Sequence, residues 1–160
     1  MKRKLMLVVA ILALVSSASF AQVKYGGGLS LGTEANDGDM GIGINARVDY
    51  SFNEKWSIAP NFTYWFSGDL IKLWQLNADV HYTFSGDEAL SFYGIGGLNY
   101  THAKLDFDFG VISGDVTENE IGLNLGVGAF LNEKFFGEVK YDTAGNTVDG
   151  QLALTFGILF

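Results

Sequence analysis

The chain has 160 residues, a length that fits one domain, and it contains no cysteine, which excludes disulfide bonds and thiolate metal sites. Glycine is abundant at 21 residues, aromatic residues make up 14%, and proline occurs once. The formal net charge of −8 argues against a nucleic-acid partner, because phosphate binding requires a basic surface.

Residues 1–21 have the features of a secretory signal peptide. A basic start, "MKRK", precedes an apolar run, "LMLVVAILALV", that is too short to span a bilayer as a helix. Small residues at Ser19 and Ala21 then predict cleavage between Ala21 and Gln22, with an uncleaved membrane anchor as the alternative. We therefore expect a signal peptide over 1–21 and one domain over 22–160, with seven basic and 18 acidic side chains and a net charge of −11.

The mature chain has a hydrophobic period of two almost throughout, which predicts strands rather than helices. We expect eight strands, at 23–31, 40–52, 56–66, 72–84, 90–101, 121–131, 135–141 and 151–160. The connections after the second, fourth and sixth strands are three to five residues long, and the others are longer and more polar. Two of the short connections repeat the letters "NEK", which hints at a repeated hairpin, and Pro60 predicts a bulge inside the third strand.

The two faces of these strands indicate the solvent that surrounds them. In "MGIGINARVDYSF" one face is wholly apolar, and the other carries Arg47 and Asp49 beside glycine, asparagine and serine. A soluble barrel turns its charges outward, whereas a membrane barrel turns apolar residues to lipid and polar residues to the lumen. Strands of about ten residues match an apolar band of about 25 Å, and aromatic residues fall near both strand ends. The prediction is an all-β, eight-stranded antiparallel up-and-down transmembrane β-barrel, closed because backbone groups in lipid must be paired.

The pattern resembles a small Gram-negative outer-membrane β-barrel of the outer-membrane protein A and protein X type. The resemblance covers the whole mature chain and includes its last strand, "LALTFGILF", which ends on Phe160. It implies that Phe160, with Phe156 and Ile158 on the same face, is the signal read by the barrel-assembly machinery. It also implies short periplasmic turns, both termini in the periplasm, and contact with outer-membrane lipid and lipopolysaccharide. Because the sequence stops at the barrel, we expect the periplasmic peptidoglycan-binding domain of protein A to be absent.

Charged residues on the polar faces predict one layer inside the barrel. Counting from the short turns places seven residues at similar heights, namely Arg47, Asp49, Asn61, Asp79, His81, Glu138 and Lys140. Two cations face three carboxylates there, so we expect the carboxylates to favour a protonated His81. The layer is either an ion path or a structural plug, because buried charges need partners and eight strands leave room only for side chains.

Two outer connections offer surface features. The segment "HAKLDFDFGVISGDVTENE" still alternates, so its hairpin is expected to extend beyond the membrane with a turn near Gly110 to Gly114, and its edge is either a docking template or merely solvated. Glu34, Asp37 and Asp39 are oxygen ligands at a spacing that allows Ca²⁺ or Mg²⁺, although an acidic solvated loop explains them as well.

The sequence favours a non-enzymatic, monomeric outer-membrane protein in envelope integrity or surface interaction, with a plugged lumen, a possible surface protein partner, and no cofactor or metal. A narrow pore for ions or small solutes is the alternative. A lipid-modifying enzyme is the third reading, and it lacks a nucleophile motif beside either histidine, His81 or His102.

Overall fold

The computed structural model describes residues 22–36, 39–66, 71–108, 113–143 and 150–160. The predicted signal peptide and Asp37 lie outside these residues. The backbone of Glu34 and Asp39 is described but their side chains are not, so the predicted cation-binding loop lies outside the described part. Within the described part of the chain, no helix is long and apolar enough to cross a membrane.

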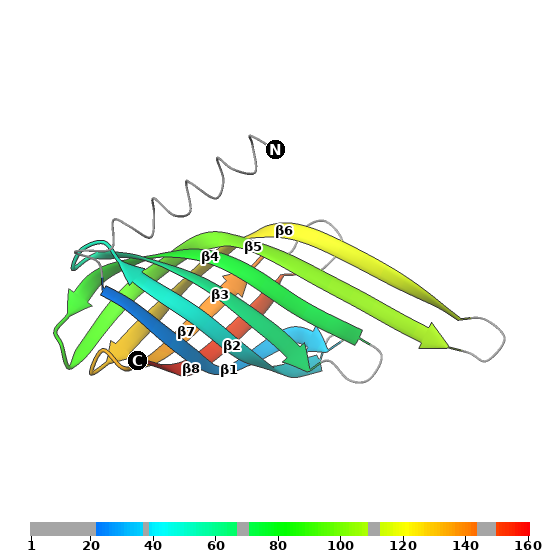
Figure 1. The fold of residues 1–160 in the computed structure, drawn as a ribbon, viewed down its shortest axis with the longest axis horizontal. Helices are drawn as coiled ribbons and strands as arrows, with labels where there is room; N and C mark the ends of the chain where they lie inside the picture. Colours follow the sequence, from blue (N-terminus) through cyan, green and yellow to red (C-terminus); the bar gives the residue numbers. More distant parts are fainter. Residues whose placement is uncertain (1–21, 37–38, 67–70, 109–112, 144–149) are drawn as a thin grey trace, which may run out of the picture.

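Eight antiparallel strands form a closed barrel (Figure 1). Each strand pairs with its neighbours in the chain, and β1 pairs with β8 to close the ring. The fold class predicted from the period of two is therefore confirmed. The strands are β1 (Gln22–Asn36), β2 (Asp39–Ser51), β3 (Trp56–Phe66), β4 (Ile71–Gly86), β5 (Leu90–Asp108), β6 (Ser113–Leu131), β7 (Phe135–Asp142) and β8 (Gln151–Leu159).

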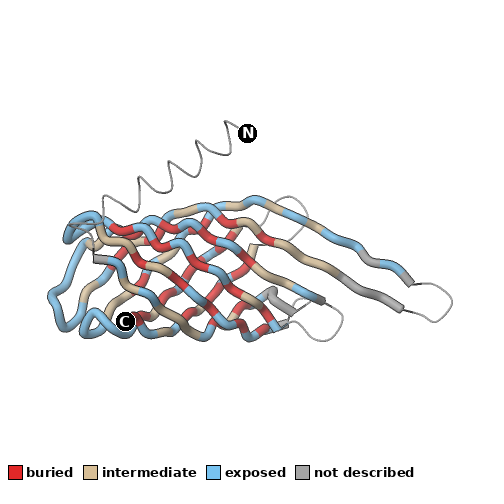
Figure 2. Tube along the Cα trace, in the orientation of Figure 1, coloured by how far each residue is buried: buried red, intermediate tan, exposed pale blue. Residues whose placement is uncertain are grey.

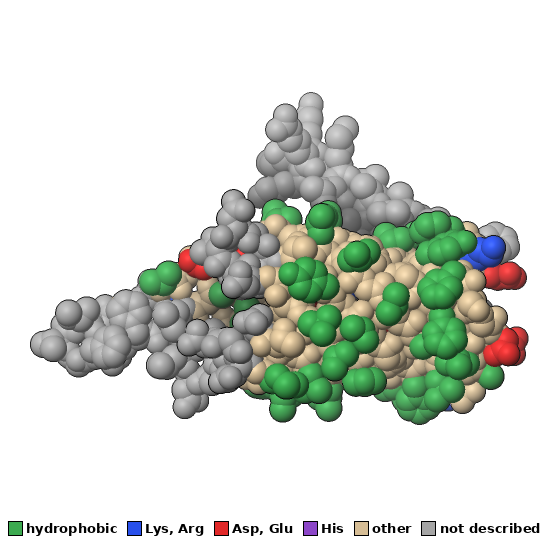
Figure 3. Space-filling model, turned by 180° about the vertical axis from the view of Figure 1, so that it is seen from behind, with side chains coloured by type: hydrophobic (Ala, Val, Ile, Leu, Met, Phe, Trp, Pro, Cys, Tyr) green, Lys and Arg blue, Asp and Glu red, His purple; other side chains and the backbone are tan. Residues whose placement is uncertain are grey.

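Burial alternates along the strands as the sequence pattern does. In β3 every second side chain is buried, and these are the residues that the pattern assigned to the polar face, from Ser57 to Trp65 (Figure 2). Large apolar side chains point outward, including Ile121 at 73% exposed and Leu125 at 74%. Figure 3 shows hydrophobic side chains spread over the barrel wall, with charged ones toward its two ends. A surface of this kind is stable in lipid and not in water.

The strands are longer than predicted at one end of the barrel. The segment 32–40 reads as a loop, yet β1 continues to Asn36 and β2 begins at Asp39, with a register shift after Gly32. Polar residues suggest a loop, but ladder hydrogen bonds hold the backbone here. At the other end, the predicted short connections are confirmed at 52–55, 87–89 and 132–134.

The predicted bulge at Pro60 is wrong. Pairing between β2 and β3 skips two positions, between Arg47↔Asn61 and Tyr50↔Ile58, and it resumes in the same register. The pairing of β3 with β4 runs unbroken through Pro60↔Ala78. Proline removes a donor and adds no residue, so the ladder loses bonds without shifting.

A hairpin projects from the end opposite the short turns (Figure 1). β5 and β6 stay paired out to Asp108↔Ser113, whereas β4 accompanies β5 only as far as Leu105. Among the described residues, β7 begins to pair with β6 at Asn124, which leaves 113–122 without a partner strand on that side. We call residues 105–108 and 113–116 the hairpin tip, and 113–122 the open edge of β6. The predicted extension of this hairpin as strand is thus confirmed. The predicted turn near Gly110 to Gly114 lies partly outside the described residues, and Gly114 belongs to β6, where it pairs with Phe107.

Candidate functional site

The lumen brings together the seven residues expected to form a polar layer. They come from β2, β3, β4 and β7, and none is more than 7% exposed. Each lies at an inward position of an alternating strand, which is why the sequence places it there. Their contacts group them into two clusters, one around Glu138 and one around Asp79.

The first cluster centres on a charged pair between β2 and β7. Arg47 Nη1 donates to Glu138 Oε1 at 2.7 Å, and the Tyr93 hydroxyl donates to the same oxygen at 2.8 Å. The guanidinium carbon of Arg47 also lies 4.3 Å from the centre of the Phe136 ring. Short charge-assisted bonds of this kind fix both partners in one geometry.

The geometry of His81 contradicts the protonated form expected from the charge count. Its Nε2 lies 3.4 Å from Arg47 Nη2, and a guanidinium can only donate, so Nε2 is the accepting nitrogen. The proton then sits on Nδ1, which faces Asp49 Oδ2 at 3.7 Å. A second cation at this distance from Arg47 would be repelled, so the neutral ring fits the site. The prediction of a protonated His81 was wrong because it rested on the number of charges in the layer and not on which atoms are in contact.

The second cluster surrounds Asp79 of β4. Its Oδ2 accepts from Lys140 Nζ at 3.1 Å and from Asn61 Nδ2 at 2.9 Å, and its Oδ1 accepts from Asn124 Nδ2 at 2.7 Å. Asp142 lies 3.8 Å from the same ammonium group. The carboxylate and the ammonium therefore satisfy each other within a polar shell, as a buried ion pair requires.

Tyr93 is the lumen residue that the sequence reasoning missed. It is fully buried, and its ring stacks between those of His81, at 4.6 Å, and Phe130, at 4.4 Å. The signal was available, because Leu90 and Phe92 face outward and the period of two turns Tyr93 inward. Asp142 was missed for another reason, since it is the last residue of β7 and reads as loop.

Smaller polar side chains and one large ring fill the lumen toward the projecting hairpin. Asn45 donates to Thr63, and Ser30 bonds Thr155, both at 2.9 Å. Beyond them the Trp65 indole, 1% exposed, donates to Gln75 at 3.1 Å and packs against Ala153 and Leu73. The three hydrogen bonds join neighbouring strands, whereas the packing of Trp65 against Ala153 joins β3 to β8 across the lumen.

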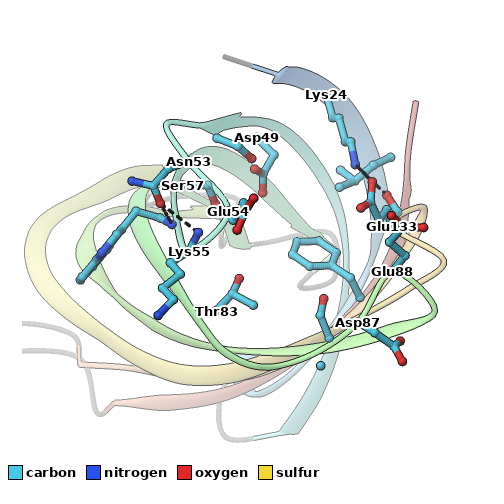
Figure 4. A pocket seen from close by; sticks show the side chains of 16 residues that line it. Lys24, Asp49, Asn53, Glu54, Lys55, Ser57, Thr83, Asp87, Glu88 and Glu133 are labelled. Atoms are coloured by element: carbon cyan, nitrogen blue, oxygen red, sulfur yellow. Dashed lines mark hydrogen bonds and ion pairs between the residues drawn. The ribbon is translucent and has the colours of Figure 1, made fainter. Parts of the chain in front are cut away.

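A cavity of about 590 Å³ opens at the short-turn end (Figure 4). Its wall reaches inward as far as Asp49, in the cluster around Glu138. Carboxylates outnumber ammonium groups on this wall, and Lys24 is bound to Glu133 at 2.9 Å. The described part of the chain holds no group of three histidine or acidic side chains placed to bind a metal ion.

The three residues of the expected assembly signal lie outward at the short-turn end. Phe156 and Phe160 are 60% and 75% exposed, and Ile158 is 38% exposed. The backbone of Phe160 exchanges two hydrogen bonds with Tyr25 of β1, at 2.8 and 2.9 Å. The last residue of the chain thus completes the seam between the first and last strands.

Solved structures share this fold at low sequence identity. The N-terminal β-barrel domain of OprF from Pseudomonas aeruginosa is 14% identical, with a TM-score of 0.58, 88% of this chain covered and 97% of that one. Ail, the attachment invasion locus protein of Yersinia pestis, is 22% identical, with a TM-score of 0.53 and the same coverage. Neisserial surface protein A is 17% identical, with a TM-score of 0.56, 87% of this chain covered and 97% of that one.

These likenesses show the fold and do not decide the activity. PagL, described as an outer membrane enzyme, is 13% identical with a TM-score of 0.55. The fold is thus compatible with catalysis as well as with other roles. The curated proteins contain no match to this chain.

The family is decided by the sequence itself. Residues 5–155 match the family model of the outer membrane protein beta-barrel domain, which covers nearly the whole chain and all but the end of β8. The closed ring, the outward apolar side chains and the polar lumen are the features of a barrel that spans a membrane. The chain belongs to the family of outer membrane protein beta-barrel domains, an outer-membrane family.

Proposed function

We propose that this protein is a non-conducting, non-enzymatic barrel that displays the β5–β6 hairpin at the cell surface for contact with a partner. The observation that carries the proposal is the hairpin, which continues past the rest of the barrel with an open edge on β6. An unpaired strand edge offers main-chain hydrogen bonds to an added strand.

The lumen supports a plug rather than a pore. Arg47 and Glu138 join β2 to β7 across the lumen, and Asp79 joins β4 to β6 and β7. A conducting path would require these short bonds to open, which separates charges that now satisfy each other inside the lumen. The narrow pore is the second candidate, favoured by the cavity at the short-turn end.

The charge of the hairpin bears on the kind of partner. Ail has been solved with the heparin analogue sucrose octasulfate, a polyanion. The hairpin of this chain is acidic, with one lysine against five carboxylates, namely Lys104 and Asp106, Asp108, Asp115, Glu118 and Glu120. A basic extended segment therefore suits the open edge of β6, and a sulfated polyanion does not.

The contacts of the two histidines argue against catalysis. His81 touches Arg47, Asp49, Glu138 and Tyr93, and these contacts hold it inside the charged lumen. His102 contacts Asn119 and Trp74 on the outer wall. A hydrolytic site would need a hydroxyl nucleophile bonded to one of these rings.

We also propose how the protein reaches the outer membrane and how it is oriented there. Residues 1–21 are cleaved as a signal peptide, and the barrel-assembly machinery reads the end of β8 through Phe156, Ile158 and Phe160. The short turns and both termini then face the periplasm. The protein acts as a monomer in contact with outer-membrane lipid and lipopolysaccharide.

Conductance tests the closed lumen directly. The mature chain is refolded in detergent, its folding is checked by the heat-dependent gel shift, and it is added to a planar bilayer. Folded protein is expected to stay silent. Stable, reproducible openings would overturn the plug and make the protein a narrow channel.

Partner chemistry is tested on the same refolded protein. Immobilised poly-lysine and immobilised heparin serve as the basic and the sulfated probe. Binding to poly-lysine that is lost when residues 106–115 are replaced by Asn-Gly supports the acidic hairpin as the docking element. Binding to heparin alone would refute it.

A further inference from the structure

The cavity at the short-turn end reaches a buried carboxylate. Asp49 lines this cavity although it is only 4% exposed. Figure 4 shows the side chains of Asp49 and Glu54 pointing into the same opening. The volume of about 590 Å³ lies in the range of sites that bind small molecules. The cavity is therefore large enough for a ligand and has a charged group at its inner end.

One carboxylate oxygen of Asp49 lacks a hydrogen-bond donor among the described residues. This oxygen, Oδ2, is buried and accepts no hydrogen bond there. Arg47 Nη2 and His81 Nδ1 each lie 3.7 Å from it, which is beyond the distance of a hydrogen bond. Arg47 makes its short bond to Glu138 instead, at 2.7 Å. A buried carboxylate in this state is unfavourable, so a cation that enters from the cavity would stabilise it.

The rest of the cavity wall is acidic as well. Its five carboxylates are Asp49, Glu54, Asp87, Glu88 and Glu133, and its two ammonium groups are Lys24 and Lys55. Lys24 and Glu133 bind each other at 2.9 Å, which leaves four carboxylates against one ammonium group. The amino terminus expected at Gln22 and the terminal carboxylate of Phe160 lie at the same end of the barrel and offset each other. The wall therefore favours a positively charged ligand.

The lining points to an organic cation rather than a metal ion. The described part of the chain offers no group of three histidine or acidic side chains that could hold a metal ion, and divalent ions need several such ligands. The Phe130 ring lines the cavity and stacks on Tyr93 at 4.4 Å. An aromatic ring attracts an ammonium group and packs against methylene groups. An alkylammonium ion therefore matches both the carboxylates and the ring.

The negative charge lies at two levels of the cavity. Asp49 precedes the connection 52–55 by three residues, which along a tilted strand is about 8 Å below the turn that carries Glu54. Glu88 lies in the short turn 87–89, at the same end. A slender chain with an ammonium group at each end can reach both levels, whereas a single amine reaches one.

We propose that this cavity binds a linear polyamine, with one terminal ammonium group on Asp49 and the other at the rim carboxylates Glu54 and Glu88. The ammonium group at the inner end supplies the donor that Asp49 lacks, as a charge-assisted hydrogen bond. The methylene chain lies beside Phe130.

The site is tested by isothermal titration of spermidine into the refolded mature chain in detergent, at an ionic strength that screens weak surface pairs. The heat-dependent gel shift checks the folding of every variant. We expect Asp49→Asn to weaken spermidine binding about 10-fold or more, because a charge-assisted hydrogen bond is lost. Glu54→Gln/Glu88→Gln removes two exposed charges from short turns, and the expected loss is about fivefold. Unchanged affinity in the folded cavity variants would overturn the proposal.

The variant in which Asn-Gly replaces residues 106–115 is the matched control. It removes three carboxylates from the other end of the barrel, namely Asp106, Asp108 and Asp115. Spermidine affinity is expected to stay the same in this variant. A loss as large as in Glu54→Gln/Glu88→Gln would show a response to net charge alone and would refute the cavity as the site.

Butylamine and Mg²⁺ test the class of ligand. Butylamine reaches one level of the cavity, so the native protein should bind it more weakly than spermidine. This preference should shrink in Glu54→Gln/Glu88→Gln, which decides the matter even if Asp49→Asn does not fold. Mg²⁺ at equal charge concentration is expected not to displace spermidine. Displacement by Mg²⁺, or equal binding of the two amines by the native protein, would contradict a polyamine site.

This inference goes beyond the proposed surface role and does not depend on it. Binding of poly-lysine tests the hairpin, whereas binding of spermidine tests the cavity at the opposite end. The variant with Asn-Gly in place of residues 106–115 should lose the first and keep the second. Failure of one proposal is therefore distinct from failure of the other.

Discussion

Glu138 depends on two donors, Arg47 and Tyr93, that reach it from other strands. Replacing Arg47 by Met leaves this carboxylate buried without its cation, and we expect the free energy of unfolding to fall by about 3–5 kcal/mol. Urea titration in detergent micelles, followed by tryptophan fluorescence, measures the loss.

The double variant Arg47→Met/Glu138→Leu is the control for this prediction. It removes both charges, so it is expected to be more stable than Arg47→Met alone, although one residue more is changed. If the single and double variants lose the same stability, the two side chains are not coupled. Tyr93→Phe should cost less, about 1.5–3 kcal/mol, because one hydrogen bond to a charged group is lost.

Because Gly128 of β6 has no side chain, the Tyr93 ring can occupy the space beside it. A Cβ at Gly128 would lie 2.6 Å from Cε2 and from the hydroxyl oxygen of Tyr93, whereas a Cβ at Gly94 meets nothing within 4 Å. We expect Gly128→Ala to destabilise the barrel by about 1–3 kcal/mol through overpacking. Gly94→Ala is the matched control and is expected to be neutral or stabilising by about 0.5–1 kcal/mol. Equal urea midpoints for the two variants would contradict this packing.

At the scale of single residues, the sequence predicts the face of a side chain and not its partner. The alternation around Arg47 and Asp79 placed both inside the barrel. It could not show that Arg47 bonds Glu138 while Lys140 bonds Asp79, because that choice depends on barrel shear and on rotamers. The protonation expected for His81 was wrong for the same reason, since a count of charges contains no distances.

At the scale of strands, two turns with the same sequence have different structures. Asn53-Glu54-Lys55 and Asn132-Glu133-Lys134 share their letters but not their structure. The side-chain oxygen of Asn53 accepts hydrogen bonds from the backbone amides of Lys55 and Trp56, whereas Asn132 and Glu133 both adopt φ of 52°. The first connection spans 52–55 and the second 132–134, so the two closures need different backbone paths. The repeated letters therefore do not indicate a repeated hairpin geometry.

The hairpin tip is expected to be dispensable for the barrel. Leu105 and Val116 face each other in the ladder, so a two-residue Asn-Gly turn can join them in place of 106–115. The removed residues pair only with each other among the described strands, and the unfolding temperature should change little. The heat-dependent gel shift measures this. Deleting β7, which is paired on both sides, is the control that should abolish the shift. Loss of folding in the tip variant would show that the tip nucleates β5–β6 pairing.

Phe160 links the last strand to both stability and assembly. Removing it deletes two backbone hydrogen bonds to Tyr25, a loss of about 1–3 kcal/mol that refolding in detergent should tolerate. In cells we expect the amount of assembled barrel to fall much further, because the proposed assembly signal ends on this residue. Phe66→Ala, an outward aromatic at the other end, is the control that should assemble normally. Equal assembled amounts in both variants would show that Phe160 contributes to the pairing of β1 with β8 but not to the assembly signal.

At the scale of the whole molecule, the two ends of the barrel differ in charge and in length. The short-turn end carries Lys24, Lys55 and Lys134 together with the open acidic cavity. The other end carries the long acidic hairpin. This asymmetry gives each end a different chemical neighbour, and the proposed surface role depends on which end faces outward.

Orientation can be read by protease cleavage in intact cells. A cleavage site inserted between Val111 and Ile112 lies at the connection of the projecting hairpin, and one inserted between Glu54 and Lys55 lies in a short turn. If β8 is read from the periplasm, the short turns remain there and the hairpin crosses to the outside. Added protease should then cut the first variant in intact cells and the second only after permeabilisation. The reverse pattern would place the projecting hairpin in the periplasm and would overturn the proposed surface role.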